Sequence, residues 1–349
     1  MSSTLEAPSP TARDERVQRR SLARRLLLRP EIGSALGAIV IFIFFLIVAD
    51  TFRTLPAQLT VLYASSTIGL MAVSVALLMI GGEFDLSSGV GVTTSALAAS
   101  MFAYQLSANV WVGVLLALVL SLAIGFLNGY LVVRTGIPSF LVTLGTFLML
   151  QGLNLAVTKI VTGNVASPPI GDIQGFDSAR AVFASSIPIG GLSIRITVLW
   201  WLLFVAVATW VLLRTKVGNW IFAVGGNPAS ARAVGVPVNR VKIGLFMAVG
   251  FTAWFTGMHL LFAFNTVQSG EGVGNEFRYI IAAVIGGALL TGGYGSAIGS
   301  AIGAFILGMA TQGIVYAGWE PDWFYFYLGL MLLLATLANN WVRSLATRR

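Results

Sequence analysis

The residues best placed to do chemistry lie in one short segment, residues 81–89, which reads GGEFDLSSG between two apolar runs. Glu83 and Asp85 place two carboxylates there, and a charge in apolar surroundings is costly unless it is paired or solvated. The glycines can end one helix, and Asp85, Ser87 or Ser88 can cap the next by accepting its free backbone N–H groups. The segment is therefore either a functional helix break on a polar path or an ordinary capped turn.

A second segment, residues 225–237, carries the start and stop signals of a short helix. An Asn cap is followed by Pro at the first helical position, and Gly with a following Pro ends the turn. The residues concerned are Asn227, Pro228, Ala229, Ser230, Ala231, Arg232 and Gly235. A helix of about two turns is unstable alone in water. Neighbouring helices or a partner protein therefore hold it in place. The alternative is a connecting loop that happens to be helical and has no function of its own.

A third polar segment, residues 269–279, combines glycines with Glu271, Glu276 and Arg278, and a further glycine-rich stretch follows at 286–295. Repeated glycine lets backbones approach closely or leaves room for a cavity. The three charged side chains could contact a soluble partner. Simple solvation beside an apolar helix is the alternative.

Several uncharged polar residues fall inside apolar runs. Asn128 and Asn154 could line a route for a hydroxylated solute, or they could tie helices together by hydrogen bonds. His259 could relay protons, but it has no evident acidic companion nearby in sequence. We expect His259 to be packed and hydrogen-bonded.

No catalytic constellation accompanies these segments. The chain has no cysteine and a single histidine, so we expect no metal site. It contains no G-x-x-x-x-G-K-[ST] phosphate-binding loop, no H-E-x-x-H and no G-x-S-x-G. We therefore predict a chain that is not an enzyme, with no catalytic residues and no cofactor.

The elements that carry these segments are membrane helices. Of the 349 residues 57% are hydrophobic and only 10% are charged, and the mean hydropathy is +0.87. Apolar runs of roughly 20 residues, the length that crosses a bilayer, recur along the chain. The predicted fold is an all-α polytopic membrane helical bundle with about ten transmembrane helices. The expected spans are residues 32–50, 60–82, 89–106, 110–133, 138–158, 196–213, 243–264, 279–291, 295–317 and 323–341.

Charge asymmetry orients the bundle. With the N-terminus inside, sixteen Lys and Arg residues fall in inner segments and five in outer segments, so both termini are expected in the cytoplasm. The same distribution argues against nucleic-acid binding, because the basic residues do not form one face. Residues 1–31 are predicted to be a disordered basic cytoplasmic tail and residues 32–342 a single transmembrane domain. Within it, residues 159–195 form an external loop and residues 214–242 a cytoplasmic loop.

These segments resemble motifs of one transporter family. Asp85, Leu86, Ser87 and Gly89 match a G-I-D-L-S-x-G element, and residues 225–235 match a G-G-N-E-A-A-x-R element followed by glycine. Residues 281–299 are similar to its glycine-rich C-terminal stretch. The sequence thus resembles, over about residues 55–340, the permease subunit of bacterial ABC importers of the ribose and xylose type. Pro228 departs from the pattern by replacing the family's glutamate.

The resemblance implies a multi-pass permease of the bacterial inner membrane that translocates a monosaccharide or related polyol. Its implied partners are ATP-binding cassette ATPase subunits, a periplasmic or lipid-anchored sugar-binding protein and a second permease copy, identical or related. Residues 227–235 would form the coupling helix that docks on the ATPase. The alternative is a stand-alone ion-coupled secondary transporter that uses Glu83 and Asp85 as coupling carboxylates. The solute itself is not specified by the chain.

Overall fold

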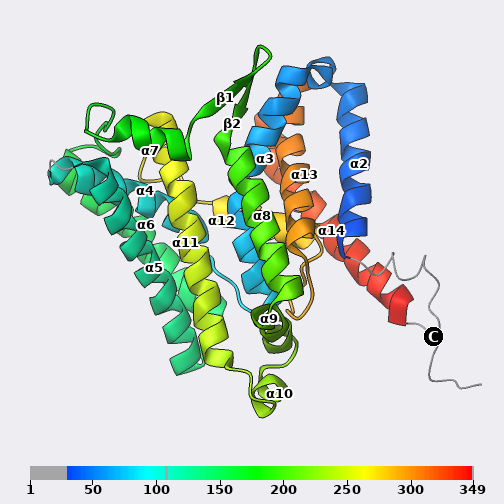
Figure 1. The fold of residues 1–349 in the computed structure, drawn as a ribbon. Helices are drawn as coiled ribbons and strands as arrows, with labels where there is room; N and C mark the ends of the chain where they lie inside the picture. Colours follow the sequence, from blue (N-terminus) through cyan, green and yellow to red (C-terminus); the bar gives the residue numbers. More distant parts are fainter. Residues whose placement is uncertain (1–29, 107–108, 348–349) are drawn as a thin grey trace, which may run out of the picture.

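The computed structural model describes residues 30–106 and 109–347, which are almost entirely helical (Figure 1). The predicted tail thus lies outside the described residues except for its last two. In chain order the elements are α2 (Pro30–Val48), η1 (Asp50–Arg53), α3 (Leu55–Ile80), α4 (Ser88–Gln105), α5 (Val110–Thr135), α6 (Ser139–Thr162), α7 (Phe176–Phe183), β1 (Ser186–Ile189), β2 (Leu192–Arg195), α8 (Ile196–Arg214), α9 (Lys216–Gly226), α10 (Pro228–Ala233), α11 (Val238–Phe264), α12 (Asn275–Ile285), α13 (Ala297–Tyr316), η2 (Pro321–Trp323) and α14 (Phe324–Thr347).

Seven of the described helices are long and apolar enough to cross a membrane, which confirms the polytopic helical bundle. They are α2, α3, α5, α6, α8, α11 and α13. Helices α3 and α11 form the centre of the bundle, since most of their residues are buried. The outer helices expose large apolar side chains, among them Leu115, Leu148 and Leu202. Such a surface suits hydrocarbon rather than water.

Small residues allow α5 and α11 to approach closely. A Cβ on Gly125 of α5 would lie 2.6 Å from the carbonyl oxygen of Phe246 on α11. One on Gly250 of α11 would lie 2.5 Å from the carbonyl oxygen of Ser121 on α5. The two helices are therefore in backbone contact, as is usual where membrane helices gain little from apolar burial alone.

Helix α12 is shorter than the sequence indicated. The predicted span 279–291 is wrong at both ends, because the helix runs from Asn275 to Ile285. Gly287 has a φ of +91°, and a Cβ on Gly286 would lie 2.4 Å from the backbone of Gly299. The positive φ turns the chain out of the helix, and the close contact with α13 fixes the place of the turn.

The two long loops contain more structure than expected. Residues 159–195 include the end of α6, helix α7 and a two-stranded antiparallel hairpin, β1–β2. Phe183 of α7 stacks on Phe262 of α11, with ring centroids 5.8 Å apart, so this loop is packed onto the bundle. Residues 214–242 contain helix α9 ahead of the predicted short helix, here α10. The hairpin and α10 lie at opposite ends of the molecule (Figure 1).

Candidate functional site

The turn between α3 and α4 is capped and buried. Asp85 Oδ1 accepts hydrogen bonds from the backbone N–H of Ser87 at 2.8 Å and from its hydroxyl at 2.5 Å. The Ser88 hydroxyl donates to the carbonyl oxygen of Asp85 at 3.0 Å. All three residues are buried, so the turn is enclosed by protein and is not a cap at an exposed surface.

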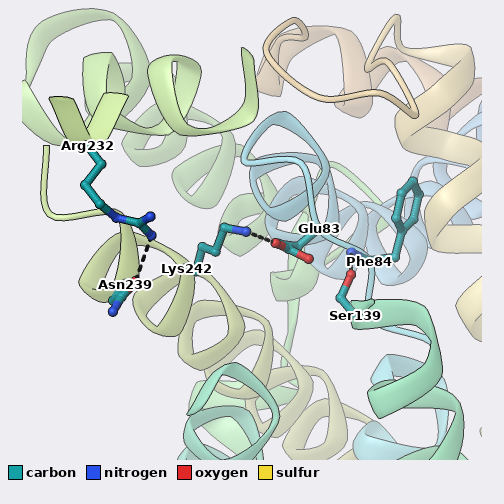
Figure 2. A network of polar contacts seen from close by, with 6 residues as sticks. All are labelled: Glu83, Phe84, Ser139, Arg232, Asn239 and Lys242. Atoms are coloured by element: carbon teal, nitrogen blue, oxygen red, sulfur yellow. Dashed lines mark hydrogen bonds and ion pairs between the residues drawn. The ribbon is translucent and has the colours of Figure 1, made fainter. Parts of the chain in front are cut away.

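Helix α6 supplies acceptors for this turn from its first two turns. The backbone N–H of Phe84 donates to the Ser139 hydroxyl at 3.0 Å, as Figure 2 shows. The backbone N–H of Leu86 donates to the Thr143 hydroxyl, also at 3.0 Å. Two main-chain donors that a helix break would leave unpaired are thus satisfied by side chains.

Asn128 and Asn154 both bond between helices in this conformation. Asn128 Nδ2 donates to the Ser87 hydroxyl at 3.1 Å, and its Oδ1 accepts from the Thr146 hydroxyl at 2.6 Å. Asn154 Oδ1 accepts from the Thr94 hydroxyl at 3.0 Å. Both amides are buried, and this arrangement corresponds to the second of the two roles considered for them.

Glu83 is paired with a residue that sequence reasoning did not single out. Its carboxylate accepts a hydrogen bond from the ammonium group of Lys242 on the second turn of α11, as Figure 2 shows. The two side chains are 8% and 18% exposed. The ion pair joins the α3–α4 turn to the helix that follows α10. The only signal in the sequence was a lysine at the start of an otherwise apolar run.

Helix α10 has the caps that its sequence predicted. The side chain of Asn227 accepts from the backbone N–H of Ser230 at 3.0 Å, and Pro228 occupies the first helical position. Gly235 has a φ of +85°, which ends the helix without the strain that a side chain would meet. Arg232 Nη2 lies 3.5 Å from Asn239 Oδ1 on α11 (Figure 2).

Four glycines meet beside α10. We call Gly82, Gly225, Gly292 and Gly293 the glycine junction. A Cβ on Gly225 would lie 1.7 Å from the carbonyl oxygen of Ile80, and one on Gly292 would lie 2.7 Å from the Cα of Gly82. The backbone N–H of Gly293 donates to the same Ile80 carbonyl at 2.8 Å. The ends of α3 and α9 and the loop before α13 are therefore in direct backbone contact.

The three charged residues of the segment 269–279 have different environments. Glu276 is buried and accepts from the backbone N–H of Gly274 at 3.1 Å. Arg278 is partly buried, and its guanidinium lies 5.0 Å from the ring centroid of Phe324. Glu271 is exposed in the loop before α12, and desolvation beside the bundle raises its pKa above the ordinary value. Of the three residues predicted to contact a binding protein, Glu271 is the one open to solvent.

His259 is buried and bonded through both ring nitrogens, as expected for a packed histidine. Its Nε2 lies 3.0 Å from the Tyr63 hydroxyl and its Nδ1 lies 2.8 Å from the carbonyl oxygen of Phe183. Among the residues that the structure describes, no group of three or more His, Cys, Asp or Glu side chains could hold a metal ion. The polar residues of these segments thus bond within and between the helix ends.

A multi-pass helical bundle with interrupted helices and buried polar turns is common among membrane transporters. Residues 58–336 match the family model described as the branched-chain amino acid transport system / permease component. The chain belongs to this family, and it is a non-catalytic translocation subunit of an ABC transporter.

Several named relatives of this chain are also import permeases. The ribose import permease protein of Escherichia coli is 31% identical over 294 residues, covering 84% of this chain and 88% of the relative. The fructose import permease protein of Rhizobium meliloti is 28% identical over 286 residues, covering 82% and 78%. The galactose/methyl galactoside import permease protein of Escherichia coli is 29% identical over 303 residues, covering 83% and 88%. No solved structure matches the chain.

Proposed function

We propose that this chain forms the path through which an ATP-driven importer carries a monosaccharide or a related polyol, delivered by a solute-binding protein. The observation that carries the proposal is the direct connection of α10 to the glycine junction, because α10 starts two residues after Gly226. A displacement of α10 is therefore transmitted directly to the ends of α3 and α9 and to the loop before α13. The relatives that are named for ribose, fructose and galactose import support this class of solute.

The proposed topology has ten crossings with both termini in the cytoplasm. It adds α4, α12 and α14 to the seven long apolar helices. Helix α12, with 11 residues, spans only about 16 Å of a core that is about 30 Å thick. Residues 286–296 complete that crossing. Gly286, Gly287 and Ala288 are buried in the protein, where a non-helical backbone is tolerated, whereas Leu290 is 47% exposed. This topology puts α10 in the cytoplasm and the β1–β2 hairpin outside.

Helix α10 is the proposed docking element for the ATPase subunit. It has six residues, too few to be stable alone, and it is held by the Asn227 cap and the buried side chain of Ala231. Its exposed face includes Arg232, and Val234 just beyond it is 79% exposed. An exposed apolar side chain beside a cation suits insertion into a groove of a partner.

Family membership supports a binding protein as a further partner. We propose that this protein is periplasmic or lipid-anchored, and that a second permease copy, identical or related, completes the importer in the bacterial inner membrane. In the present conformation we assign the contact with the binding protein to Glu271. Glu276 and Arg278 contribute only in a conformation that uncovers them.

Membership of an ABC permease family argues against the ion-coupled secondary transporter that the sequence left open, and the geometry does not favour it either. Coupling carboxylates must bind and release an ion or proton during the cycle. In this structure Glu83 is paired with Lys242, and Asp85 is bonded to Ser87. Both carboxylates are thus occupied by structural partners.

Reconstitution tests the proposed function. Proteoliposomes containing the permease, its ATPase and its binding protein are assayed for uptake of labelled D-ribose, D-fructose and D-galactose. We expect uptake to require ATP and the ATPase and to be unchanged by a proton uncoupler. Uptake by the permease alone, or its collapse with an uncoupler at constant ATP, would contradict the proposal.

A further inference from the structure

A cavity of about 380 Å³ with several polar side chains in its wall lies in the half of the bundle that faces the loop before α12. Its walls come from five helices: Tyr63 from α3, Thr93 from α4, Thr256 from α11, Arg278 from α12 and Gln312 from α13. The volume falls within the roughly 300 to 1,000 Å³ of small-molecule sites. These helices surround the centre of the bundle, and the cavity lies between them on the side away from α10.

The cavity contains buried polar atoms that lack partners. Thr93 Oγ1, Thr256 Oγ1 and Arg278 Nε have no hydrogen-bond partner among the described residues, although each atom is buried. Thr93 and Thr256 are 1% and 6% exposed. Buried polar groups in proteins are nearly always bonded, so such an atom on a cavity wall indicates a missing partner inside the cavity.

Unpartnered hydroxyls alone would not identify a site. Thr158 and Thr197 also have buried hydroxyls without a partner within the described chain, and neither lines this cavity. What distinguishes Thr93 and Thr256 is the adjoining space, which is large enough to hold a molecule that donates and accepts hydrogen bonds. The two other threonines serve as matched controls.

A second cavity has a more apolar wall. It measures about 720 Å³, lies between α3, α8, α9 and α11, and is lined mainly by apolar side chains such as Phe204 and Val207. The hydroxyls of Ser74 and Thr252 in its wall bond to each other at 2.5 Å. It therefore presents no free hydroxyl to a polar solute.

We infer that the cavity between Thr93 and Thr256 is a solute site inside a single permease subunit, and that it takes a neutral polyhydroxylated molecule. The inference rests on the proposed function. Hydroxyls that both donate and accept match the threonine hydroxyls, the Gln312 amide and the Arg278 guanidinium. Glu271 and Arg278 both line the cavity, and their opposite charges favour a neutral ligand over an anion.

On the side nearest α4, the cavity ends at a close contact between two segments of backbone. A Cβ on Gly89, at the start of α4, would lie 2.4 Å from Glu276 Oε2, and one on Gly272 would lie 2.3 Å from the carbonyl oxygen of Gly89. Gly272 lines the cavity, and Gly89 lies next to the α3–α4 turn. The solute is thus held above the turn that the Glu83–Lys242 ion pair connects to α11. Release of the solute towards the cytoplasm requires Gly89 to move away from Gly272 and Glu276.

The first test compares two double variants in the complete reconstituted importer, T93V/T256V and T158V/T197V, with labelled D-ribose, D-fructose and D-galactose as probes. Each substitution removes one hydroxyl and keeps the shape of the side chain. We expect T93V/T256V to lower the maximal uptake rate roughly tenfold, as two lost hydrogen bonds would, while ATP hydrolysis continues. The control pair should stay within about twofold of the wild type. Equal uptake by the two pairs would overturn the inference and leave the proposed function intact. A wild-type importer that carries none of the probes overturns both.

The second test does not depend on transport. The chain has no native cysteine, so Thr256→Cys provides a single thiol in the cavity and Ser193→Cys one on the exposed hairpin. A small hydrophilic thiol reagent should modify Thr256→Cys several-fold more slowly in the presence of an imported sugar and should modify Ser193→Cys at an unchanged rate. Lack of protection, or failure of the reagent to reach Thr256→Cys, would contradict the site.

Discussion

The carboxylate of Glu83 is paired with the ammonium group of Lys242, which lies 159 residues further along the chain. The pair connects the α3–α4 turn to the start of α11 and is largely buried. Removal of one member of a buried pair leaves an uncompensated charge, which costs about 3 to 5 kcal/mol. The ion pair is therefore a structural link between the cytoplasmic end proposed for α11 and the centre of the bundle.

Replacing Lys242 tests that link. We expect Lys242→Met to lower the free energy of unfolding by about 3 kcal/mol and to reduce uptake, because Glu83 is left charged and unpaired. Thermal unfolding of the purified protein in detergent measures the stability. The double variant E83Q/K242M, which removes both charges, should recover most of the loss. A single variant as stable as the wild type would show that the pair makes no net contribution.

The glycine junction gives a second prediction with a neighbouring control. Gly225→Ala should impair folding or transport severely, because its Cβ would lie 1.7 Å from the Ile80 carbonyl oxygen. Gly226→Ala meets no atom within 4 Å and should resemble the wild type. Expression in membranes and the uptake rate measure both effects. Equal behaviour of the two variants would mean that the backbones are not in contact there.

The docking role of α10 predicts uncoupling. The double variant N227A/R232A removes a cap, worth about 1 kcal/mol to the helix, and a cation on the exposed face. We expect ATP hydrolysis to continue while uptake falls at least about fivefold, a change equivalent to about 1 kcal/mol. Arg134→Ala, an exposed arginine at the end of α5, is the control and should leave uptake unchanged. Normal uptake by N227A/R232A would contradict the proposal that α10 docks on the ATPase.

The proposed orientation can be tested by labelling. Single cysteines at Ser193 in the hairpin and Ser230 in α10 both lie at exposed positions. A membrane-impermeant thiol reagent added to intact cells should label Ser193→Cys, and it should reach Ser230→Cys only after the membrane is opened. The reverse pattern would place α10 outside and would contradict the importer proposal.

Local signals in the sequence determined the long helices, the short helix α10 and the family of this protein. Apolar runs of spanning length predicted the long helices, because hydrophobic length is a property of consecutive residues. Asn227, Pro228 and Gly235 predicted α10, because caps act over three or four residues. The three glycine-rich motifs were visible as well, and their order gave the family.

Only the tertiary structure decided which of these segments meet. Lys242 as the partner of Glu83, the contact of Gly225 with Ile80 and the cavity between Thr93 and Thr256 all join residues that are far apart in the chain. The end of α12 depends in the same way on the fit of Gly286 against Gly299 of α13. Such contacts depend on how helices pack and not on the order of residues within one helix, so no local pattern encodes them.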